Sequence, residues 1–297
     1  MSRLRVTAFL LAVATVLNAF ALPLHASAND GLPYGRNDAA GHYQNVGGTT
    51  IYYEVYGADG AKKPPLVLLH DGLHGGIADF APHLPKLTPH FIIYAVATRG
   101  HGRSGVGDMA YTYQLFADDA AAILRRVTVD VAAVIGFGDG ALAALALTGE
   151  HPHLVSRVVA IGAGRSSEVL TDAGKAFVEN LSAEHFVREH PDFLAQRRAF
   201  LAKPDRWAES VDKLAALYRK RIFVSNVSIE AIVAPTLLIG GDRDERFRVA
   251  AFEELHRLIP TSRLAILPDC TRLESIQRES VWSELILPFL LENEAPR

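Results

Sequence analysis

Short polar segments that follow apolar runs contain the side chains best suited to chemistry. These segments are 70–72, 99–104, 136–140 and 240–244, and they include His70, His101, Asp139 and Asp244. A carboxylate such as Asp139 can form a covalent intermediate, and a histidine can accept or donate a proton near neutral pH. Such residues could perform nucleophilic or acid–base catalysis.

Other reactive side chains have simpler expected roles. Ser166 and Ser167 follow an apolar run, where hydroxyls usually cap helices. Cys270 has no adjacent base, so a buried thiol is its expected role. Because Cys270 is the single cysteine of the chain, neither an internal disulfide nor a Cys-x-x-Cys zinc site can form. We expect no metal site and no cofactor.

Composition is typical of a globular protein. Of the 297 residues, 49% are hydrophobic and 21% are charged, which excludes a disordered chain that could not bury enough apolar surface. The 30 basic and 33 acidic residues nearly balance, and the longest basic run is Arg219–Arg221. That run is too short to neutralise a phosphate backbone, so no nucleic-acid partner is expected.

Alternating apolar runs and helical patterns must position the polar segments. Apolar runs that we interpret as strands lie at 66–69, 91–96, 131–135, 158–161, 236–239 and 264–267, after a first strand pattern at 49–56. Helical periods lie at 113–126, 140–149, 247–258 and 276–291. Strands that are apolar on both faces and alternate with helices favour a doubly wound, mostly parallel sheet of the α/β class.

The interval 164–230 interrupts this alternation, because it contains several helical stretches without a strand between them. We predict that it is a helical cap inserted into a core formed by 49–163 and 231–297. Residues 29–48 are polar and are predicted to form an exposed segment before the core. Because the cap is rich in apolar residues, the pocket beneath it should take a small hydrophobic or amphipathic molecule.

The first 28 residues have the pattern of a secretory signal peptide. Arg3 and Arg5 precede an apolar run from Val6 to Leu24, and small residues end at Ala28, where cleavage is expected. Cleavage would leave no membrane span, and the protein would be secreted or periplasmic. The alternative is a membrane anchor formed by an uncleaved N-terminal helix, since the apolar run approaches the thickness of a bilayer core.

Together, the four polar segments resemble the motifs of the α/β-hydrolase fold family in order and approximate spacing. His70–Gly72 is similar to the turn after the third strand, where backbone N–H groups, here those of Gly72 and Leu73, help to form an oxyanion hole. Residues 99–104 are similar to the tight turn after the fourth strand. The resemblance implies an α/β-hydrolase fold with a helical cap, and it implies that Asp244 occupies the position of the catalytic acid.

The nucleophile position departs from the family pattern. Gly136–Gly140 lies between an apolar run and an alanine-rich helix, as the G-x-S-x-G elbow of the family does, but its centre is Gly138 instead of serine. In this alignment Asp139 contributes a backbone N–H to the oxyanion hole. A shift of one residue would place Asp139 at the centre, similar to the nucleophile of haloalkane dehalogenases, with Phe137 where the elbow needs a small residue.

The position of the general base also departs from the pattern. The family's histidine aligns with Arg272, whose guanidinium donates hydrogen bonds and does not accept a proton. Asp71 replaces a usual glycine in the oxyanion turn, where a carboxylate would oppose a developing oxyanion. We expect one of two arrangements: Arg272 pairs with Asp244, or Arg272 and the helix start at Asp139 bind an external carboxylate.

These departures predict a protein that keeps the fold without serine-dependent hydrolysis. Its expected function is that of a non-hydrolytic pseudoenzyme that binds a small hydrophobic or amphipathic ligand. The alternative is a hydrolase or lyase-type enzyme that acts on an ester, lactone or similar small molecule with relocated residues. Asp139, His74 and His101 are the candidates for that relocated chemistry.

Overall fold

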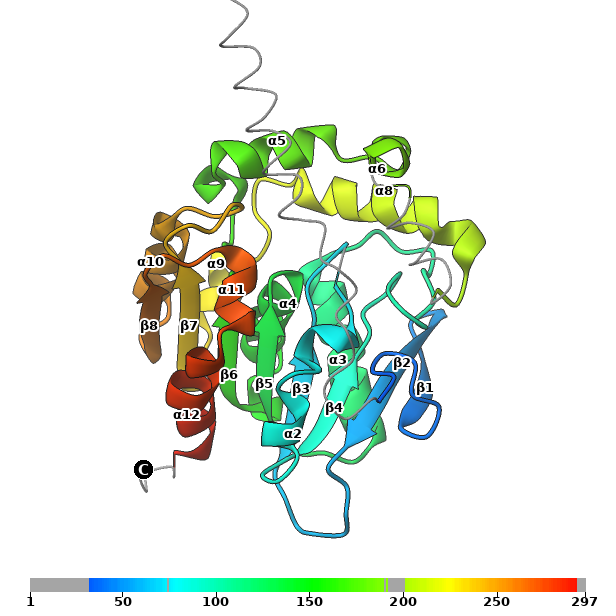
Figure 1. Cartoon of the computed structure of the whole chain (residues 1–297), viewed down its shortest axis with the longest axis vertical. Helices are drawn as coiled ribbons and strands as arrows, with labels where there is room; N and C mark the ends of the chain where they lie inside the picture. The colour runs from blue at the N-terminus through cyan, green and yellow to red at the C-terminus, as the bar shows by residue number, and fades with distance from the viewer. Residues whose placement is uncertain (1–31, 74, 190, 192–200, 293–297) are drawn as a thin grey trace, which may run out of the picture.

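A twisted sheet forms the centre of the molecule in the computed structural model, which describes residues 32–73, 75–189, 191 and 201–292. Its eight described strands follow the order β1-β2-β4-β3-β5-β6-β7-β8 (Figure 1). The antiparallel pairs join β1 (Gly41–Val46) to β2 (Thr49–Tyr56) and β2 to β4 (Ile92–Val96). The parallel strands besides β4 are β3 (Pro65–Leu69), β5 (Ala132–Phe137), β6 (Val155–Ile161), β7 (Thr236–Gly241) and β8 (Ser262–Leu267). The predicted doubly wound, mostly parallel α/β-hydrolase fold is therefore confirmed.

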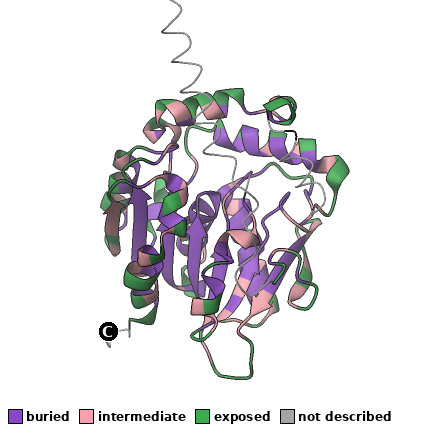
Figure 2. Ribbon diagram, viewed as in Figure 1, coloured by how far each residue is buried: buried purple, intermediate pink, exposed green. Residues whose placement is uncertain are grey.

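Helices cover both faces of this sheet. Successive strand residues point to opposite faces, so each strand contributes apolar side chains to the layer on each side. Val67 and Leu69 belong to one hydrophobic layer, whereas Leu66 and Leu68 belong to the other. The first layer includes α3 (Tyr113–Arg126), α4 (Asp139–Glu150) and α10 (Val249–Leu258). The second includes the short helices η1 (Ile77–Phe80) and α2 (Leu84–Leu87) and the C-terminal helices. Figure 2 shows the strands largely buried between these layers.

The two long helices beside β5 differ in composition because they differ in burial. Helix α3 begins where the Thr112 side chain accepts a hydrogen bond from Leu115 N at 2.9 Å, and it ends with Arg125 and Arg126, whose charges suit a helix C-terminus. Helix α4 is alanine-rich, and its residues 139–148 are all buried. A helix buried on every side can be apolar all round, and small side chains allow close approach to its neighbours.

The N-terminal segment is more structured than predicted. Residues 29–48 were expected to form an exposed segment before the core. The β1 residues are indeed exposed or half-buried, but within the described residues from 32 onward the chain is part of the sheet, because β1 pairs with β2. Glu54 on β2 is fully buried, and its carboxylate accepts hydrogen bonds from Gly35 N at 2.8 Å and Asn37 N at 2.7 Å. Tyr52 and Tyr56 hydroxyls donate to the same carboxylate at 2.7 Å. The hydrolase core thus begins before Thr49.

A helical layer lies between β6 and β7 in sequence and over one edge of the sheet (Figure 1). Its elements are η3 (Ser167–Val169), α5 (Asp172–Asn180), α6 (Ala183–Glu189), η4 (Pro204–Arg206), α8 (Trp207–Tyr218) and α9 (Asn226–Glu230). Helix α9 packs directly on α4, because a Cβ added to Gly149 would meet the Ser228 carbonyl oxygen at 2.0 Å. The α5, α6 and α8 helices therefore form the part of this insertion that covers the edge.

The C-terminal helix is interrupted. One helical period was predicted for 276–291, but the described chain forms α11 (Arg272–Gln277), a wide helical turn η5 (Val281–Ile286) and α12 (Leu287–Leu291). Arg278 has an extended backbone with ψ 118°, and the Trp282 indole donates to the Ile276 carbonyl across the break at 2.5 Å. Among the described helices, none combines the length and apolar character needed to span a bilayer. The predicted signal peptide at 1–28 lies outside the described residues.

Candidate functional site

The loops that follow β3, β5, β7 and β8 bring the sequence-predicted site residues together at one edge of the sheet, beneath the cap helices (Figure 1). The first three loops contain Asp71, Gly138 and Asp244, and the loop after β8 leads into α11, whose first residue is Arg272. Loops at the carboxyl ends of parallel strands are a common place for ligand sites, because several segments converge there. The site can therefore be built from the contacts of these residues.

The elbow after β5 is centred on Gly138. Its φ of 58° and ψ of −115° turn the chain sharply into α4, and its N–H donates to the Ile161 carbonyl at 2.9 Å. The flanking positions must be small, since a Cβ on Gly136 would lie 2.2 Å from the Gly140 carbonyl oxygen. Asp139 is the first residue of α4, so the shifted elbow centred on Asp139 is not the one that the backbone adopts.

The space where a nucleophile would stand is occupied. A Cβ built on Gly138 would lie 1.9 Å from Asp71 Oδ1 and 2.1 Å from Arg272 Nη2. Real Cβ atoms do not approach other heavy atoms so closely, so any side chain at Gly138 requires both groups to move. A carboxylate oxygen and a guanidinium nitrogen fill the volume that the family gives to serine.

Arg272 pairs with Asp71, which differs from both arrangements expected from the sequence. Its Nη2 lies 2.7 Å from Asp71 Oδ1, and its Nη1 donates to the Gly162 carbonyl at 2.7 Å. Arg272 is buried as the first residue of α11, and its guanidinium lies 5.2 Å from the centre of the Phe137 ring. The expected pair with Asp244 is therefore wrong, and the carboxylate that meets Arg272 belongs to the chain itself.

Asp71 also uses two of the three backbone donors that were expected to stabilise an oxyanion. Its Oδ1 accepts from Gly72 N at 2.8 Å and from Asp139 N at 3.0 Å. Burial opposes ionisation of Asp71, but the guanidiniums of Arg272 and Arg246 and these N–H groups hold the pKa of the carboxyl below its usual value. The Gly72 and Asp139 N–H groups proposed for ligand binding thus already have a negatively charged acceptor.

Asp244 keeps the acid position without a histidine partner. Its Oδ1 accepts from Arg246 N and Phe247 N at 2.8 Å each, which fixes the loop after β7. Its Oδ2 is buried and has no hydrogen-bond partner among the described residues. Burial raises the pKa of this carboxyl, although nearby Arg272 partly opposes the shift. Asp244 is therefore a loop-fixing residue whose second oxygen faces the place of the missing base.

Asp139 points away from the elbow toward two tyrosines. Tyr113 at the start of α3 donates to its Oδ1 at 3.0 Å, and Tyr218 on the cap helix α8 donates to its Oδ2 at 2.5 Å. Burial and the neighbouring Asp71 carboxylate raise the pKa of Asp139 to about 6. Sequence reasoning missed the hydroxyl roles of both tyrosines, because each side chain also suits an apolar helix face.

Arg246 is a further residue that the sequence did not indicate. It lies two positions after Asp244, is 7% exposed, and its Nε has no hydrogen-bond partner in the described part of the chain. Its guanidinium lies 4.3 Å from the ring centre of Phe177 on α5 and 5.1 Å from that of Tyr218 on α8. Stacking on two cap aromatics positions this positive charge between the cap and the elbow.

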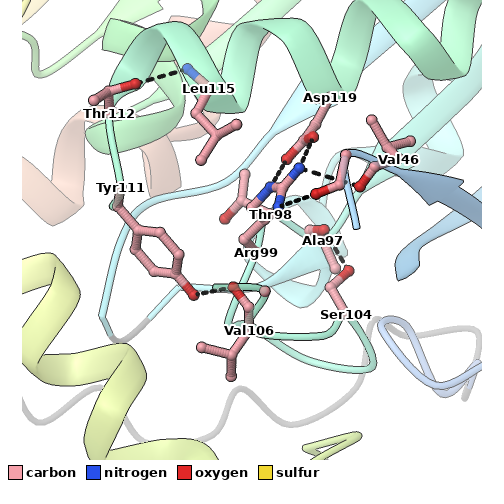
Figure 3. Close-up of polar contacts among 12 residues, drawn as sticks. Val46, Ala97, Thr98, Arg99, Ser104, Val106, Tyr111, Thr112, Leu115 and Asp119 are labelled. Carbon is pink, nitrogen blue, oxygen red and sulfur yellow. Dashed lines mark hydrogen bonds and ion pairs between the residues drawn. The ribbon is translucent and has the colours of Figure 1, made fainter. Parts of the chain in front are cut away.

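The turn after β4 is held by buried polar contacts (Figure 3). Arg99 Nε and Nη2 donate to the two oxygens of Asp119 at 2.6 and 2.7 Å. The Ser104 hydroxyl donates to the Ala97 carbonyl at 2.6 Å (Figure 3), so Ser104 is structural. His101 Nδ1 lies 3.0 Å from the Arg99 carbonyl oxygen, which places this histidine in the same network. His74 lies outside the described residues.

A small cavity of about 20 Å³ separates this turn from the cap helix α8. Leu73 of the oxyanion turn, with a φ of 34°, and His101 line it from the core side. The lining residues from the cap side are Leu201, Trp207, Ser210, Val211 and Leu214. This volume holds about one water molecule.

The remaining sequence candidates do not form a second reactive centre. Ser166 is buried before η3, and the Ser167 hydroxyl lies 3.5 Å from the Arg221 carbonyl oxygen. Burial raises the pKa of the Cys270 thiol, which lies 3.5 Å from the Thr271 carbonyl oxygen. Within the described ranges, no cluster of three histidine, cysteine or acidic side chains could hold a metal ion.

Comparisons with known proteins agree with the fold. The family model described as "Alpha/beta hydrolase family" matches residues 66–274. The chain is 25% identical to 2-(acetamidomethylene)succinate hydrolase of Mesorhizobium japonicum, over 69% of this chain and 80% of that protein. It is 24% identical to serine hydrolase BPHL of Homo sapiens, over 75% of this chain and 77% of that protein. The enol-lactonase structure from Burkholderia xenovorans has a TM-score of 0.66 at 23% identity, and the match covers 84% of this chain and 100% of that chain.

Proposed function

This chain belongs to the alpha/beta hydrolase family, and from that premise we propose that it is a non-hydrolytic member that binds a small hydrophobic or amphipathic molecule. One observation supports the proposal most strongly. Asp71 Oδ1 and Arg272 Nη2 occupy the volume that a side chain on Gly138 would need, with separations of 1.9 and 2.1 Å from the built Cβ. A serine at this elbow would fit only if the side chains of Asp71 and Arg272 moved.

The other parts of the serine mechanism are replaced as well. Arg272 stands where a proton acceptor is needed, and a guanidinium has no lone pair to accept a proton. The N–H groups of Gly72 and Asp139 are occupied by the Asp71 carboxylate. Because nucleophile, base and oxyanion hole act as a unit, their joint replacement closes the covalent route to hydrolysis.

The ligand part of the proposal rests on the lining beneath the cap. Leucine, valine and tryptophan side chains surround the cavity beside His101 and Ser210. The volume of this cavity, about 20 Å³, is too small for an organic molecule. Binding of the ligand in this cavity therefore requires α8 to move away from the turn at Gly100–Gly102. One relative named above is a hydrolase of 2-(acetamidomethylene)succinate, a small molecule, which supports a small ligand for this chain.

Export is proposed from the pattern of residues 1–28. A positively charged start, an apolar run and small residues before Asn29 are the parts of a cleavable signal. The measurement is N-terminal sequencing of protein recovered outside the cytoplasm, which should begin at Asn29. A product that retains Met1 and sediments with membranes would favour the anchor instead.

An ester-hydrolysis assay tests the lost activity. The wild type should not turn over p-nitrophenyl acetate above the uncatalysed rate. The double variant Gly138→Ser, Arg272→His, which motif alignment alone would suggest, should also stay inactive because the serine would collide with Asp71. The triple variant Asp71→Gly, Gly138→Ser, Arg272→His frees both the elbow and the oxyanion donors, and it should show turnover that a serine-reactive fluorophosphonate abolishes.

Wild-type turnover would contradict the proposal, and its cause can be traced. The carboxyl of Asp139, with a pKa of about 6, is able to donate or accept a proton near neutral pH. This observation favours a second candidate function, an enzyme with acid–base chemistry at Asp139. Wild-type activity that Asp139→Asn removes, and that the fluorophosphonate leaves intact, would establish this second candidate.

A further inference from the structure

The Asp71 carboxylate is bound as a ligand would be. Three donors converge on its Oδ1: N of the adjacent Gly72 at 2.8 Å, Asp139 N at the start of α4 at 3.0 Å, and Arg272 Nη2 at the start of α11 at 2.7 Å. Arg272 itself is 4% exposed, so its charge is held in place by burial and by the Gly162 carbonyl. Charge-assisted bonds to a fixed guanidinium and to backbone N–H groups are strong and directional.

The receptor for this carboxylate is built from parts that do not depend on the Asp71 side chain. The N–H of Asp139 belongs to the first turn of α4, a helix of 12 residues, whose partial positive charge favours an anion. Gly138 leaves open the volume that the carboxylate enters. Nearby, the guanidinium of Arg246 is held against Phe177 and Tyr218, and its Nε has no hydrogen-bond partner among the described residues.

We propose that the N–H groups of Gly72 and Asp139 and the guanidinium of Arg272, around the elbow after β5, form a preformed receptor for one carboxylate group. Asp71 is the built-in ligand of this receptor. When the Asp71 side chain is removed, the receptor binds free acetate. The proposal rests on the same site as the proposed function. An aspartate side chain is a CH₂ group with a carboxylate, and acetate is the same group with one more hydrogen. Asp71→Gly therefore leaves a vacancy that acetate matches in size, shape and charge.

Charge balance restricts the ligand to a monoanion. The half-buried carboxyl of Asp71 and the buried carboxyls of Asp139 and Asp244 lie near the guanidiniums of Arg246 and Arg272. Removing Asp71 removes one negative charge, which acetate restores and which a dianion would exceed. A longer acid such as propionate would need space for an additional methylene between packed groups, so it should bind more weakly than acetate.

The native protein should not bind acetate at this place. Asp71 is tethered to its receptor and acts at an effective concentration far above that of a dissolved salt. The side chain of Asp71 is 23% exposed, but its Oδ1 already has its three donors. A ligand that enters beneath the cap therefore meets no vacant anion receptor at the elbow, and the inference narrows the proposed ligand to one without a carboxylate at that end.

Thermal unfolding of the wild type, Asp71→Gly and Asp38→Gly over an acetate series tests the proposal, with ionic strength held constant by chloride. Asp38 is the matched control, because it also pairs with an arginine, Arg103, but its side chain is 85% exposed. Asp71→Gly alone should gain Tm with acetate, by roughly 3–6 °C at ten times the dissociation constant. Propionate and sulfate should have smaller effects.

Two further measurements keep the outcome decisive. If Asp71→Gly does not fold in chloride, its refolding yield should be restored by acetate, and equal yields in both salts would overturn the proposal. The double variant Asp71→Gly, Arg272→Met removes both charges, so it should fold and lose the acetate response. An equal acetate response in all variants, or none in folded Asp71→Gly, would also overturn it. Esterase activity is measured separately, so a failed rescue is distinct from a failed pseudoenzyme assignment.

Discussion

Gly138 is the residue on which the site depends, since it combines a positive φ of 58° with a fully occupied side-chain volume. Gly138→Ala should lower the free energy of unfolding by roughly 2–4 kcal/mol, because backbone strain and overpacking both contribute. Urea denaturation measures this change. Gly48→Ala is the matched control, because Gly48 also has a positive φ of 78° but an added Cβ there would have no neighbour within 4 Å.

The control separates the two contributions. Gly48→Ala should reduce stability only by the backbone term, on the order of 1 kcal/mol. If both substitutions cost the same, Asp71 and Arg272 must yield to a methyl group easily, and the elbow would then have room for a nucleophile. That result would weaken the proposed loss of hydrolysis.

The sequence predicted which positions matter at this scale, but not how they pair. Gly138, Asp244 and Arg272 follow strands in a recognisable order, so alignment with the family motifs locates them. The salt bridge of Arg272 with Asp71 joins residues 201 positions apart, and it depends on which carboxylate the guanidinium meets in three dimensions. No local pattern contains that information.

At the scale of elements, the turn after β4 depends on its attachment to α3. Asp119 on α3 is 2% exposed and accepts two hydrogen bonds from Arg99 (Figure 3). Asp119→Asn should lower the free energy of unfolding by about 3–5 kcal/mol, because it leaves the buried guanidinium of Arg99 without a charged partner. Chemical denaturation measures the loss.

The neighbouring carboxylate provides the control for this prediction. Asp118 precedes Asp119 on α3, but its side chain is 49% exposed and pairs with His151 at the surface. Asp118→Asn should change stability by less than about 1 kcal/mol. A similar small effect at Asp119 would show that water can reach Arg99, and the turn would not be fixed by this pair.

Elements were predicted best where one periodic pattern has clear ends. The helix predicted at 113–126 coincides with α3, because Thr112 caps its start and basic residues end it. The single helix predicted at 276–291 was wrong, because the apolar spacing continues across Arg278, whose backbone is extended. Likewise, the polar composition of residues before Thr49 gave no sign of β1, since an edge strand has few buried side chains.

For the whole molecule, the buried carboxyls under the cap predict an unusual dependence of stability on pH. The pKa of Asp139 is raised from 3.8 to about 6 by burial and by Asp71, so between these values the folded state holds a proton that the unfolded state has released. The contribution of Asp139 to stability should therefore fall as pH rises from about 4 to 6, by up to about 3 kcal/mol, whereas His83, whose pKa burial lowers to about 4, contributes a rise over the same range. Urea titrations at several pH values measure the slope.

Asp139→Asn should remove the contribution of Asp139, because the amide stays uncharged at every pH, so the stability of the wild type relative to this variant should fall between pH 4 and 6. Asp172→Asn, at a carboxyl that is 94% exposed, is the control and should keep the wild-type profile. The contribution of Asp71 to stability changes with pH in the opposite direction, because its lowered pKa gives stability that is lost in more acidic solution. A stability difference between the wild type and Asp139→Asn that does not fall between pH 4 and 6 would contradict the assignment of the extra proton to Asp139.

The overall architecture was the most predictable feature, since alternating strands and helices with both sheet faces apolar leave few topologies. The cap's position over the loops after β3 and β5 required the structure, because its contacts with the core, such as Tyr218 with Asp139, join distant segments. Sequence periodicity predicts which face of a helix is apolar, but not which loop that face covers.

The contact between Asp71 and Arg272 also limits the routes by which this protein could change over generations. Installing serine at Gly138 first would force it into the Asp71 carboxylate. Removing Asp71 first would leave the buried charge of Arg272 without its partner, and replacing Arg272 first would leave Asp71 without its partner. Each single step toward the family motif is thus expected to lower stability, so this contact favours an evolutionary route in which Asp71 and Arg272 change together before a serine enters.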